Sequence, residues 1–435
     1  MAIISPTGLL GARSPIYISW DGTSTQEIES FTLEIYAWTG DKDTRPATPI
    51  YTIARTSGFV DIYPTANIAP LLRDQFDPKI GKWDQIDPLN YSPDSFLWVE
   101  VDYDIDYNNG GGTLNSTGTT ERFIVSNAYS TLLEGTNATI NNHILWNTDN
   151  RYLHELDTQM LPVFLGADPL TGLDIVYGYE DRVVADGGTI ESLQCANIGL
   201  RYLKILNDDG TSYQFEVTET FMGGDLAQDR VILLPVGIAN LTNRKDAVGL
   251  SGTAPYLTEY YDAQLINGFG EVIDERRIYN VCEPKYTPQQ IFFVNKLGAW
   301  DSITFFKKQT ESVNITKQSY KPSLGSSGSI GFTFNTQSAT KQNYNYTKEN
   351  RMILNTGFVD EAFGDVIEEM LMSETLFMVY DRITNRSGTT FEIGQSYRWV
   401  NVVTTNIEKQ KHINDKTINY TLEIEYNDLE QNLVV

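Results

Sequence analysis

The densest group of potential metal ligands in the sequence is the segment DYDIDYN at residues 102–108. Carboxylates at every second position superficially resemble the start of an EF-hand calcium loop, whose sixth and twelfth residues should be Gly and Glu. Those positions hold Tyr107 and Thr113, so the calcium pattern fails twice. Strict alternation with apolar residues favours a solvated strand face, with a weak cation site as the alternative. The candidate ligands of that site are Asp102, Asp104 and Asp106.

Side chains that could act in catalysis are few and follow no known pattern. The chain has three histidines, His143, His154 and His412, and no nucleophile elbow, HExxH, CxxC, P-loop or GxGxxG motif accompanies them. We therefore expect no enzyme, no catalytic residue and no cofactor. The two cysteines, Cys195 and Cys282, are too few for a disulfide framework or a four-cysteine zinc site. Two free thiols and one disulfide are both compatible with the sequence.

Charge and composition narrow the class of protein. A formal net charge of −25 repels a nucleic-acid backbone, so we expect no direct nucleic-acid binding. No basic n-region opens the chain, and no apolar run approaches the roughly 18 residues that span a bilayer, so we expect no secretory signal and no membrane contact. An acidic, aromatic-rich β protein is compatible with a glycosidase. With 57 acidic residues, however, carboxylate pairs arise by chance, and this interpretation is the weaker one.

The elements that would position these side chains are mainly strands. Between residues 14 and 130, short apolar runs alternate with turn residues, which is typical of an antiparallel β-sandwich of the immunoglobulin or fibronectin type III kind. In FTLEIYAW (31–38), Phe31, Leu33 and Ile35 share one face, as in a strand. We expect the glycine-rich segment 108–120 to be an exposed, mobile hairpin loop. The strand-like runs are SPIYISW, FTLEIYAW, PIYTIAR, FVDIY, FLWVEVDYDIDY and ERFIV.

The chain of 435 residues is long enough for about three domains, and we predict a mainly β fold. Two hairpins are predicted at Asp209-Gly210 and Asn267-Gly268, because both dipeptides favour tight turns between strands. The predicted parts are an N-terminal β-sandwich (1–130), a linker (131–160), a second β domain (161–285) and a smaller α+β C-terminal domain (286–435).

The C-terminal part contains one helical pattern. In GFVDEAFGDVIEEMLMS (357–373), apolar residues recur at helical spacing, which predicts an amphipathic helix. INYTLEIEYN (418–427) alternates like a half-buried strand, and SLGSSGSIG (323–331) is expected to be a loop. The apolar side of the helix comprises Val359, Phe363, Val366, Ile367, Met370 and Leu371, and its polar side Asp360, Glu361, Asp365, Glu368 and Glu369.

The segment FVNKLGAWDSITFFKK (293–308) carries the most informative apolar pattern. We predict two strands at residues 291–294 and 303–306, joined by a tight turn at Leu297-Gly298-Ala299. Its large side chains are candidates for the core or for a contact between subunits. The interface candidates are Phe293, Trp300, Phe305 and Phe306.

The same segment lies within CEPKYTPQQIFFVNKLGAWDSITFFKKQTESVNITKQSY (282–320). This run resembles a module of virion structural proteins of tailed bacteriophages, particularly those that infect Bacteroidetes or marine bacteria. The resemblance rests on Cys-x-x-Lys-Tyr-Thr-Pro, an apolar strand, Phe-Val-Asn-Lys-x-Gly-Ala and Phe-Phe-Lys-Lys. Upstream, the N-terminal strands and the Ile-Ala-Pro-Leu-Leu-Arg-Asp element (68–74) are similar to the opening β domain of the same proteins. At Ala299-Trp300-Asp301 the chain departs from the short turn that other members often carry.

The resemblance implies a tail, ring or connector protein without enzymatic activity. Its expected partners are other copies of itself, in a cyclic homo-oligomer, and other virion tail or connector proteins. It would be made and assembled in the host cytoplasm and reside in the virion. The main alternative is a carbohydrate-binding or receptor-binding protein at the tail tip. A secreted adhesin or glycosidase is a third interpretation, for which the sequence encodes no export signal.

Overall fold

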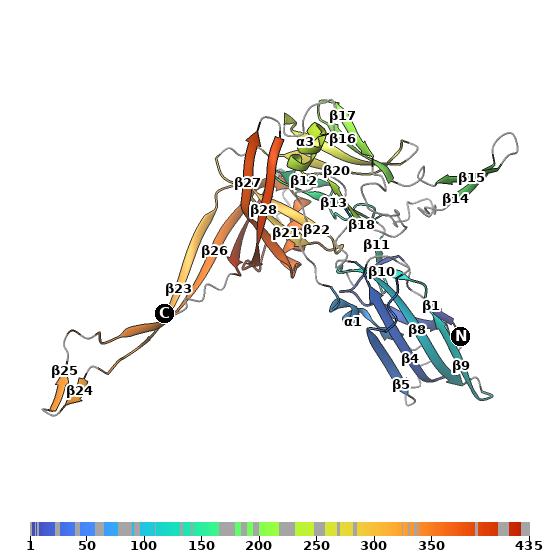
Figure 1. Cartoon of the computed structure of the whole chain (residues 1–435), viewed down its shortest axis with the longest axis horizontal. Coiled ribbons are helices and arrows are strands. Elements are labelled where there is room, and N and C mark those ends of the chain that lie inside the picture. Colours follow the sequence, from blue (N-terminus) through green and yellow to red (C-terminus); the bar gives the residue numbers. More distant parts are fainter. Residues whose placement is uncertain are drawn as a thin grey trace.

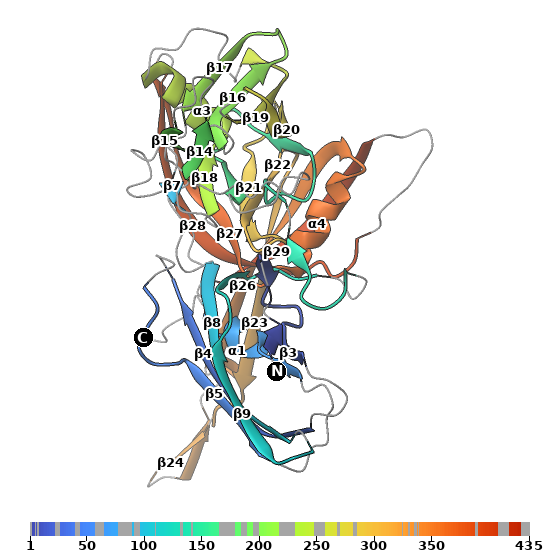
Figure 2. The ribbon, with the colours of Figure 1, turned by 90° about the vertical axis from the view of Figure 1, so that its right-hand side faces the viewer.

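The computed structural model describes most of the chain, and strands dominate it (Figures 1 and 2). As predicted, the fold is mainly β, with several antiparallel sheets. Figure 1 shows an N-terminal sandwich, a central body and an arm that projects away from the body. The described residues are 2–4, 6, 8–21, 27–39, 44–56, 65–76, 89–90, 96–108, 110–130, 134–140, 142–164, 179–183, 189–194, 200–216, 231–247, 257–267, 270–281, 285–323, 325–328, 331–334, 337, 339–387, 390–407 and 417–427.

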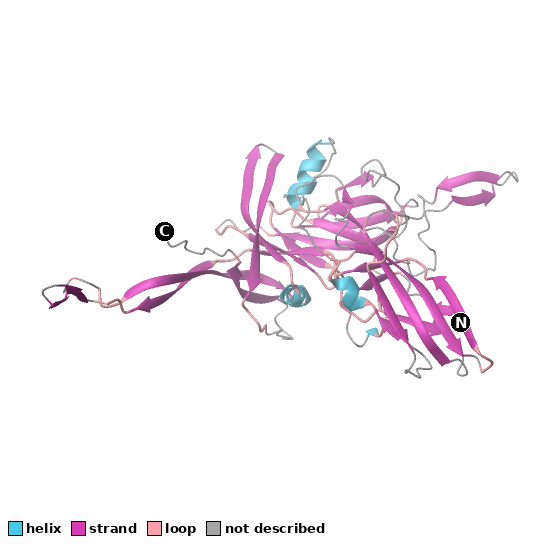
Figure 3. Cartoon of the chain, turned by 60° about the horizontal axis from the view of Figure 1, so that its bottom comes forward, coloured by secondary structure: helices cyan, strands magenta, loops and turns pink. Residues whose placement is uncertain are grey.

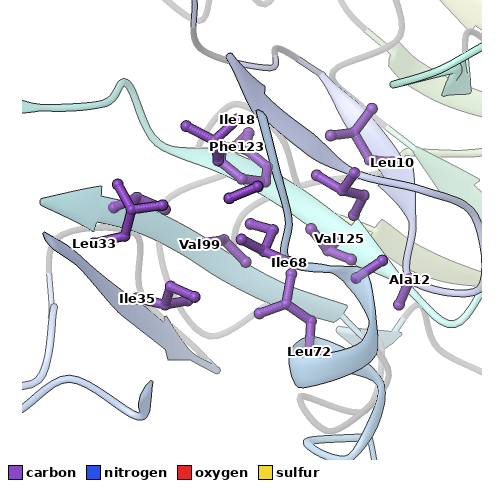
Figure 4. Close-up of a cluster of buried hydrophobic side chains, with 14 of the residues drawn as sticks. Leu10, Ala12, Ile18, Leu33, Ile35, Ile68, Leu72, Val99, Phe123 and Val125 are labelled. Atoms are coloured by element: carbon purple, nitrogen blue, oxygen red, sulfur yellow. The ribbon is translucent and has the colours of Figure 1, made fainter. Parts of the chain in front are cut away.

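The N-terminal part is a sandwich of two sheets. A three-stranded sheet (β1-β3-β6) faces a larger one (β11-β2-β10-β8-β4-β5, with β9 on β8), and apolar side chains from both sheets and from α1 fill the space between them (Figure 4). The strand expected at FVDIY lies outside the described residues. The elements are β1 (Ala2–Ile4), β2 (Leu9–Gly11), β3 (Tyr17–Asp21), β4 (Glu27–Trp38), β5 (Tyr51–Thr56), β6 (Thr65–Asn67), α1 (Ala69–Arg73), β8 (Phe96–Asn108), β9 (Thr113–Thr119), β10 (Phe123–Ser126) and β11 (Thr139–Ile140).

The glycine-rich segment 108–120 is not a loop throughout. Residues Thr113–Thr119 form β9, which pairs with β8 from Asn108↔Thr113 to Asp102↔Thr119. Only the turn around Gly110 and Gly112, both with positive φ, matches the prediction. The polar composition of this segment predicted a loop. The preceding 13-residue strand, however, offers a free edge with which the backbone of residues 113–119 can pair.

The middle part contains a five-stranded sheet (β12-β20-β19-β16-β17) and a three-stranded sheet (β13-β18-β7). The hairpin at Asp209-Gly210 is present, and β19 pairs with β20 as predicted, although Gly268 itself lies outside the described residues. The elements are β7 (Leu89–Asn90), β12 (Asn150–Leu153), β13 (Met160–Phe164), β14 (Tyr179–Val183), β15 (Thr189–Gln194), β16 (Leu200–Asn207), β17 (Ser212–Glu216), β18 (Val231–Pro235), α3 (Ile238–Ala247), β19 (Tyr260–Asn267) and β20 (Val272–Asn280).

Residues 131–160 are not the linker that their polar composition suggests. Ile144, Leu145 and Trp146 are fully buried, and Ile144 and Trp146 belong to the core of the middle part. The same segment supplies β11 to the N-terminal sandwich and β12 to the five-stranded sheet. Its few apolar residues are enough to anchor it because Ile144 and Trp146 join the core of the middle part and Leu145 joins a second buried cluster.

The C-terminal part is a seven-stranded sheet in the order β22-β21-β27-β28-β29-β26-β23, with α4 packed against it. The alternation predicted for residues 418–427 is confirmed, because Tyr420, Leu422 and Ile424 are buried. The expected loop at 323–331 contributes to a two-stranded hairpin, β24–β25. The elements are β21 (Gln289–Val294), β22 (Trp300–Phe305), β23 (Thr310–Tyr320), β24 (Gly325–Gly328), β25 (Gly331–Phe334), β26 (Gln342–Asp360), α4 (Phe363–Met372), β27 (Leu376–Ser387), β28 (Thr390–Val402) and β29 (Thr417–Tyr426).

The predicted amphipathic helix exists, but it begins later than its apolar pattern suggests. Val359 belongs to β26, and α4 starts at Phe363, whose backbone N–H donates to the Asp360 carboxylate (2.9 Å). Glu369, expected on the polar side, is only 4% exposed. The alternation of a strand and the spacing of a helix coincide over these few residues, so the pattern alone could not place the boundary.

A single core joins the three predicted domains. Strand β21 is apolar on both sides: Ile291 and Phe293 face the core beneath α4, while Phe292 and Val294 face this junction core. Such two-sided burial explains the unbroken run Ile-Phe-Phe-Val. The junction core comprises Leu9, Tyr36, Trp38, Trp98, Ile124, Leu145, Met160, Phe164, Leu233, Phe292, Val294, Leu297, Ala299, Trp300, Phe377 and Val379.

Candidate functional site: the projecting arm

The four interface candidates lie inside the chain. Phe293 and Phe305 are fully buried beneath α4, and Trp300 packs in the junction core against Phe377, with ring centroids 5.7 Å apart. Phe306 is 2% exposed. None of the four offers exposed surface to a partner subunit, so they are core residues, and the contact surface of the protein must be sought elsewhere.

The predicted turn at Leu297-Gly298-Ala299 is present and joins β21 to β22. The side-chain oxygen of Asn295 accepts a hydrogen bond from the backbone N–H of Ala299 (3.1 Å), and its amide donates to the carbonyl of Leu145 (2.7 Å). Gly298 has φ +79°, and a Cβ atom there would lie 2.7 Å from Ser126 Oγ. Glycine is therefore required both by the backbone conformation and by close contact with the N-terminal sandwich.

A buried ion pair lies beside this turn. Arg151 Nη2 is 2.6 Å from Asp301 Oδ2, both side chains are at most 2% exposed, and the guanidinium lies 4.6 Å from the Trp146 ring centroid. The backbone N–H of Ser302 also donates to Asp301 (2.7 Å). Near them, burial and the negative charge of Asp301 raise the pKa of Glu369 to about 7. The two opposite charges are buried from solvent and neutralise each other. The ion pair therefore links the segment 148–153 to β22.

The aspartates of the suggested cation site are held by neighbouring side chains. Asp104 and Asp106 both accept hydrogen bonds from Asn115 on β9 (2.6 and 2.8 Å). Burial alone would raise the pKa of Asp102, but hydrogen bonds from Arg45 and Thr119 outweigh it and hold that pKa below its usual value. Within the described ranges, no group of three or more His, Cys, Asp or Glu side chains could hold a metal ion.

A cavity of about 700 Å³ lies between α1 and the residues that follow α4. Glu374 forms ion pairs with both Arg13 (2.6 Å) and Arg73 at this cavity. Asp74 also lines it, so two cations face two carboxylates. Because these charges balance, the cavity has no excess charge that would select an ionic ligand. It lies where the N-terminal sandwich meets the C-terminal part. The pairing question for Cys195 and Cys282 lies outside the described residues.

The most distinctive surface of the molecule is the arm, which we define as residues 307–351. It comprises β23, the outer part of β26 and the small hairpin β24–β25, and it extends away from the body (Figures 1 and 3). Every residue of β23 is exposed, and β23 is the last strand in its sheet. An isolated two-stranded ribbon is marginally stable in water, so such an element gains stability when another surface covers it.

The two faces of the arm differ in character. On one face, Val313 and Ile315 follow Met352 outward, because Glu311 pairs with Met352 and every second residue shares a side. Met352 is 3% exposed within the core beneath α4, whereas Val313 and Ile315 are 56% and 52% exposed. On the opposite face, Arg351 forms ion pairs with Glu423 (3.3 Å) and with two further glutamates. The first face thus continues the side that is buried beneath α4, and it carries two exposed apolar side chains opposite Asn350 and Lys348.

Comparison with known proteins does not assign this chain to a family. No protein-family model matches this sequence, and no curated protein shows significant similarity to it. Among the helices in the described parts of the chain, none is long and apolar enough to cross a membrane. Sequence reasoning missed Val313 and Ile315, although the alternation in ESVNITK (311–317) was the available signal.

Proposed function

We propose that this protein is a non-enzymatic structural component of a tailed-phage virion, located in the tail, a ring or the head-to-tail region. In this role it assembles into a cyclic homo-oligomer and contacts other tail or connector proteins, after synthesis in the host cytoplasm. The resemblance of residues 282–320 and of the N-terminal strands to such proteins supports the phage assignment. The phage assignment rests on this resemblance only.

The observation that carries the assembly role is the exposed core-side face of the arm. A chain that functioned as a monomer would leave Val313 and Ile315 in water on a two-stranded ribbon. Exposed apolar surface on an extended element is a feature of surfaces that bind another chain. The sealed junction core supplies the rigid body from which such an arm can be held out.

Mass photometry and negative-stain imaging of the purified full-length protein test this proposal. We expect closed rings of a single stoichiometry. A matched variant in which residues 314–349 are replaced by Asn-Gly should fold, because the opposed residues Val313 and Asn350 remain to close a hairpin. That variant should stay monomeric. A full-length protein that remains monomeric and is absent from the mass spectra of purified virions would overturn the proposal.

Two exposed aromatic side chains favour receptor or carbohydrate binding as a second candidate function. Trp399 is 47% exposed and Tyr380 is 57% exposed on the β27–β28 pair, and aromatic rings of this kind stack on sugars. Arg398 lies 4.2 Å from the Tyr380 ring centroid, and the Phe377 ring lies 4.1 Å from that of Trp399, so each aromatic ring already has one neighbour and a sugar would stack on what remains exposed. Binding to a host glycan that Trp399→Ala abolishes, with ring formation intact, would support this candidate.

A further inference from the structure

Charge is distributed very unevenly between the arm and the rest of the chain. Residues 307–351 contain seven lysines and arginines and two glutamates, a net charge of +5, whereas the remaining residues contain 25 basic and 55 acidic side chains, a net charge of −30. The outer lysines Lys317, Lys321 and Lys341 are all exposed. A basic projection on so acidic a chain selects an acidic partner surface.

The position of the arm shows which acidic surface it can meet. It points away from its own body, so its outer lysines cannot lie on the acidic surface of the same copy (Figures 1 and 3). Two arms side by side would bring +5 against +5 and repel each other. The body of a neighbouring copy offers the opposite charge and is present wherever the protein assembles. A contact between two different surfaces is head to tail, and it closes into a ring when the rotation between copies permits.

The chemistry of the arm favours a protein partner over nucleic acid. On its core-side face, Val313 and Ile315 lie opposite Asn350 and Lys348, so a partner must cover apolar side chains as well as meet lysines. A phosphate backbone would be attracted by the arm but repelled by the −30 carried by the remaining residues. The acidic surface of a second protein copy satisfies both the apolar and the charged features.

We propose that the arm of one copy docks on the acidic body of the next copy, so that each interface joins an arm to a body. This inference rests on the proposed assembly role and adds the contact that builds it. Val313 and Ile315 are buried in the contact, and the outer lysines steer and orient it. Assembly then weakens as the salt concentration rises, because exposed charges are screened.

A mixing experiment separates arm-to-body docking from arm-to-arm pairing. A tagged chain with residues 314–349 replaced by Asn-Gly keeps the acidic body and lacks the outer arm. Arm-to-body docking predicts that untagged full-length protein co-purifies with this shortened chain, because full-length arms find its body. Arm-to-arm pairing predicts no co-purification, because the shortened chain has no arm to offer.

Charge reversal tests the physical basis of the contact. Lys317→Glu, Lys321→Glu and Lys341→Glu together in the full-length chain should raise the apparent dissociation constant for the shortened chain by at least about tenfold. The matched control reverses two exposed positive charges on the body of the shortened chain, Arg55→Glu and Lys285→Glu, and pairs it with the wild-type full-length protein. These changes should not weaken binding, because they make the acceptor surface more acidic. Melting curves verify that both variants fold.

Three outcomes would overturn the docking inference. Rings of full-length protein that never capture the shortened chain would mean that arms pair with arms, and the proposed function would stand. Unchanged affinity after the triple reversal would mean that charge does not select the partner, again with the proposed function intact. Duplex DNA binding that the triple reversal abolishes, while assembly is unaffected, would identify nucleic acid as the partner. A full-length chain that never oligomerises would instead remove the proposed function itself.

Discussion

The buried core of the body and the arm contain the same kind of residues in the same kind of strand, and they differ in what covers them. Ile303 on β22 is fully buried, whereas Ile315 on the next strand, β23, is 52% exposed. Both belong to one sheet. The difference arises because α4 and the neighbouring strands cover β22, while β23 runs beyond the edge of the body. An alternating sequence therefore specifies a strand with an apolar face. The elements packed around that strand decide whether the face becomes part of a core or stays exposed for a partner.

Ion pairs show the same contrast between the two regions. Arg151 and Asp301 are at most 2% exposed, so each charged group contacts the other in place of water. Arg351 and Glu423 are 32% and 37% exposed and remain largely hydrated. Removal of one partner should be costly where the other cannot regain water, and nearly neutral where it can. The two arginines thus form a matched pair for experiments.

The largest expected effect is that of Arg151→Met. The substitution keeps an apolar chain of similar length beside Trp146 and leaves the Asp301 carboxylate buried without its cation. We expect the free energy of unfolding at pH 8 to fall by about 3–5 kcal/mol. Urea unfolding followed by tryptophan fluorescence measures the change.

Arg351→Met is the control for that experiment. Its glutamate partners stay exposed to water, so the expected loss is about 0–1 kcal/mol. Similar losses for the two variants would contradict the view that burial, more than pairing, separates the body from the arm.

The second effect concerns pH and the buried Glu369. Its folded-state pKa of about 7 lies above the ordinary value near 4.5, so between these pH values the folded state binds more protons than the unfolded state. The free energy of unfolding should therefore fall as pH rises from about 4.5 to about 7 and then level off. Glu369→Gln should remove this dependence and stabilise the protein at pH 8 by up to about 3 kcal/mol.

The exposed neighbour Glu368 supplies the control for the pH experiment. Glu368→Gln removes the same formal charge from the solvent side of α4 and should leave the pH dependence in place. Stability measured by urea unfolding at pH 5, 6, 7 and 8 distinguishes the variants. A Glu369→Gln protein that retains the wild-type slope would show that another group titrates in this window.

Most strands could be predicted from the sequence because alternation records which side of a strand is buried. The two strands and the turn predicted in residues 291–306 are present, although the second strand begins at Trp300, three residues earlier than the pattern placed it. Burial by the other domains could not be predicted, since Tyr36 and Trp38 on the polar side of β4 belong to the junction core, which gathers residues from all parts of the chain. The linker interpretation of residues 131–160 failed for the same reason.

Candidate functional residues were harder to predict than the strands. Large aromatic residues such as Trp300 and Phe305 attract attention in a sequence, but large apolar side chains are usually core. Partnership between Arg151 and Asp301 spans 150 positions and leaves no local signal. The arm, in contrast, displays alternating Val313 and Ile315 with no distinctive residue, and only its place outside the body gives that pattern a function.

The smallest expected effect isolates the contrast between core and arm with one methyl group. Ile303→Val should lower the free energy of unfolding by about 0.5–1.5 kcal/mol, because the packed core leaves a cavity where the methyl group was. Ile315→Val should change monomer stability by less than about 0.5 kcal/mol, measured in the shared background Lys317→Glu, Lys321→Glu, Lys341→Glu at a concentration where mass photometry shows only monomers. In the wild-type background, the Ile315 variant should instead weaken ring formation measurably by mass photometry. If Ile315→Val destabilises the monomer as much as Ile303→Val does, its own chain already covers the arm, and the exposed face is not the surface on which copies meet.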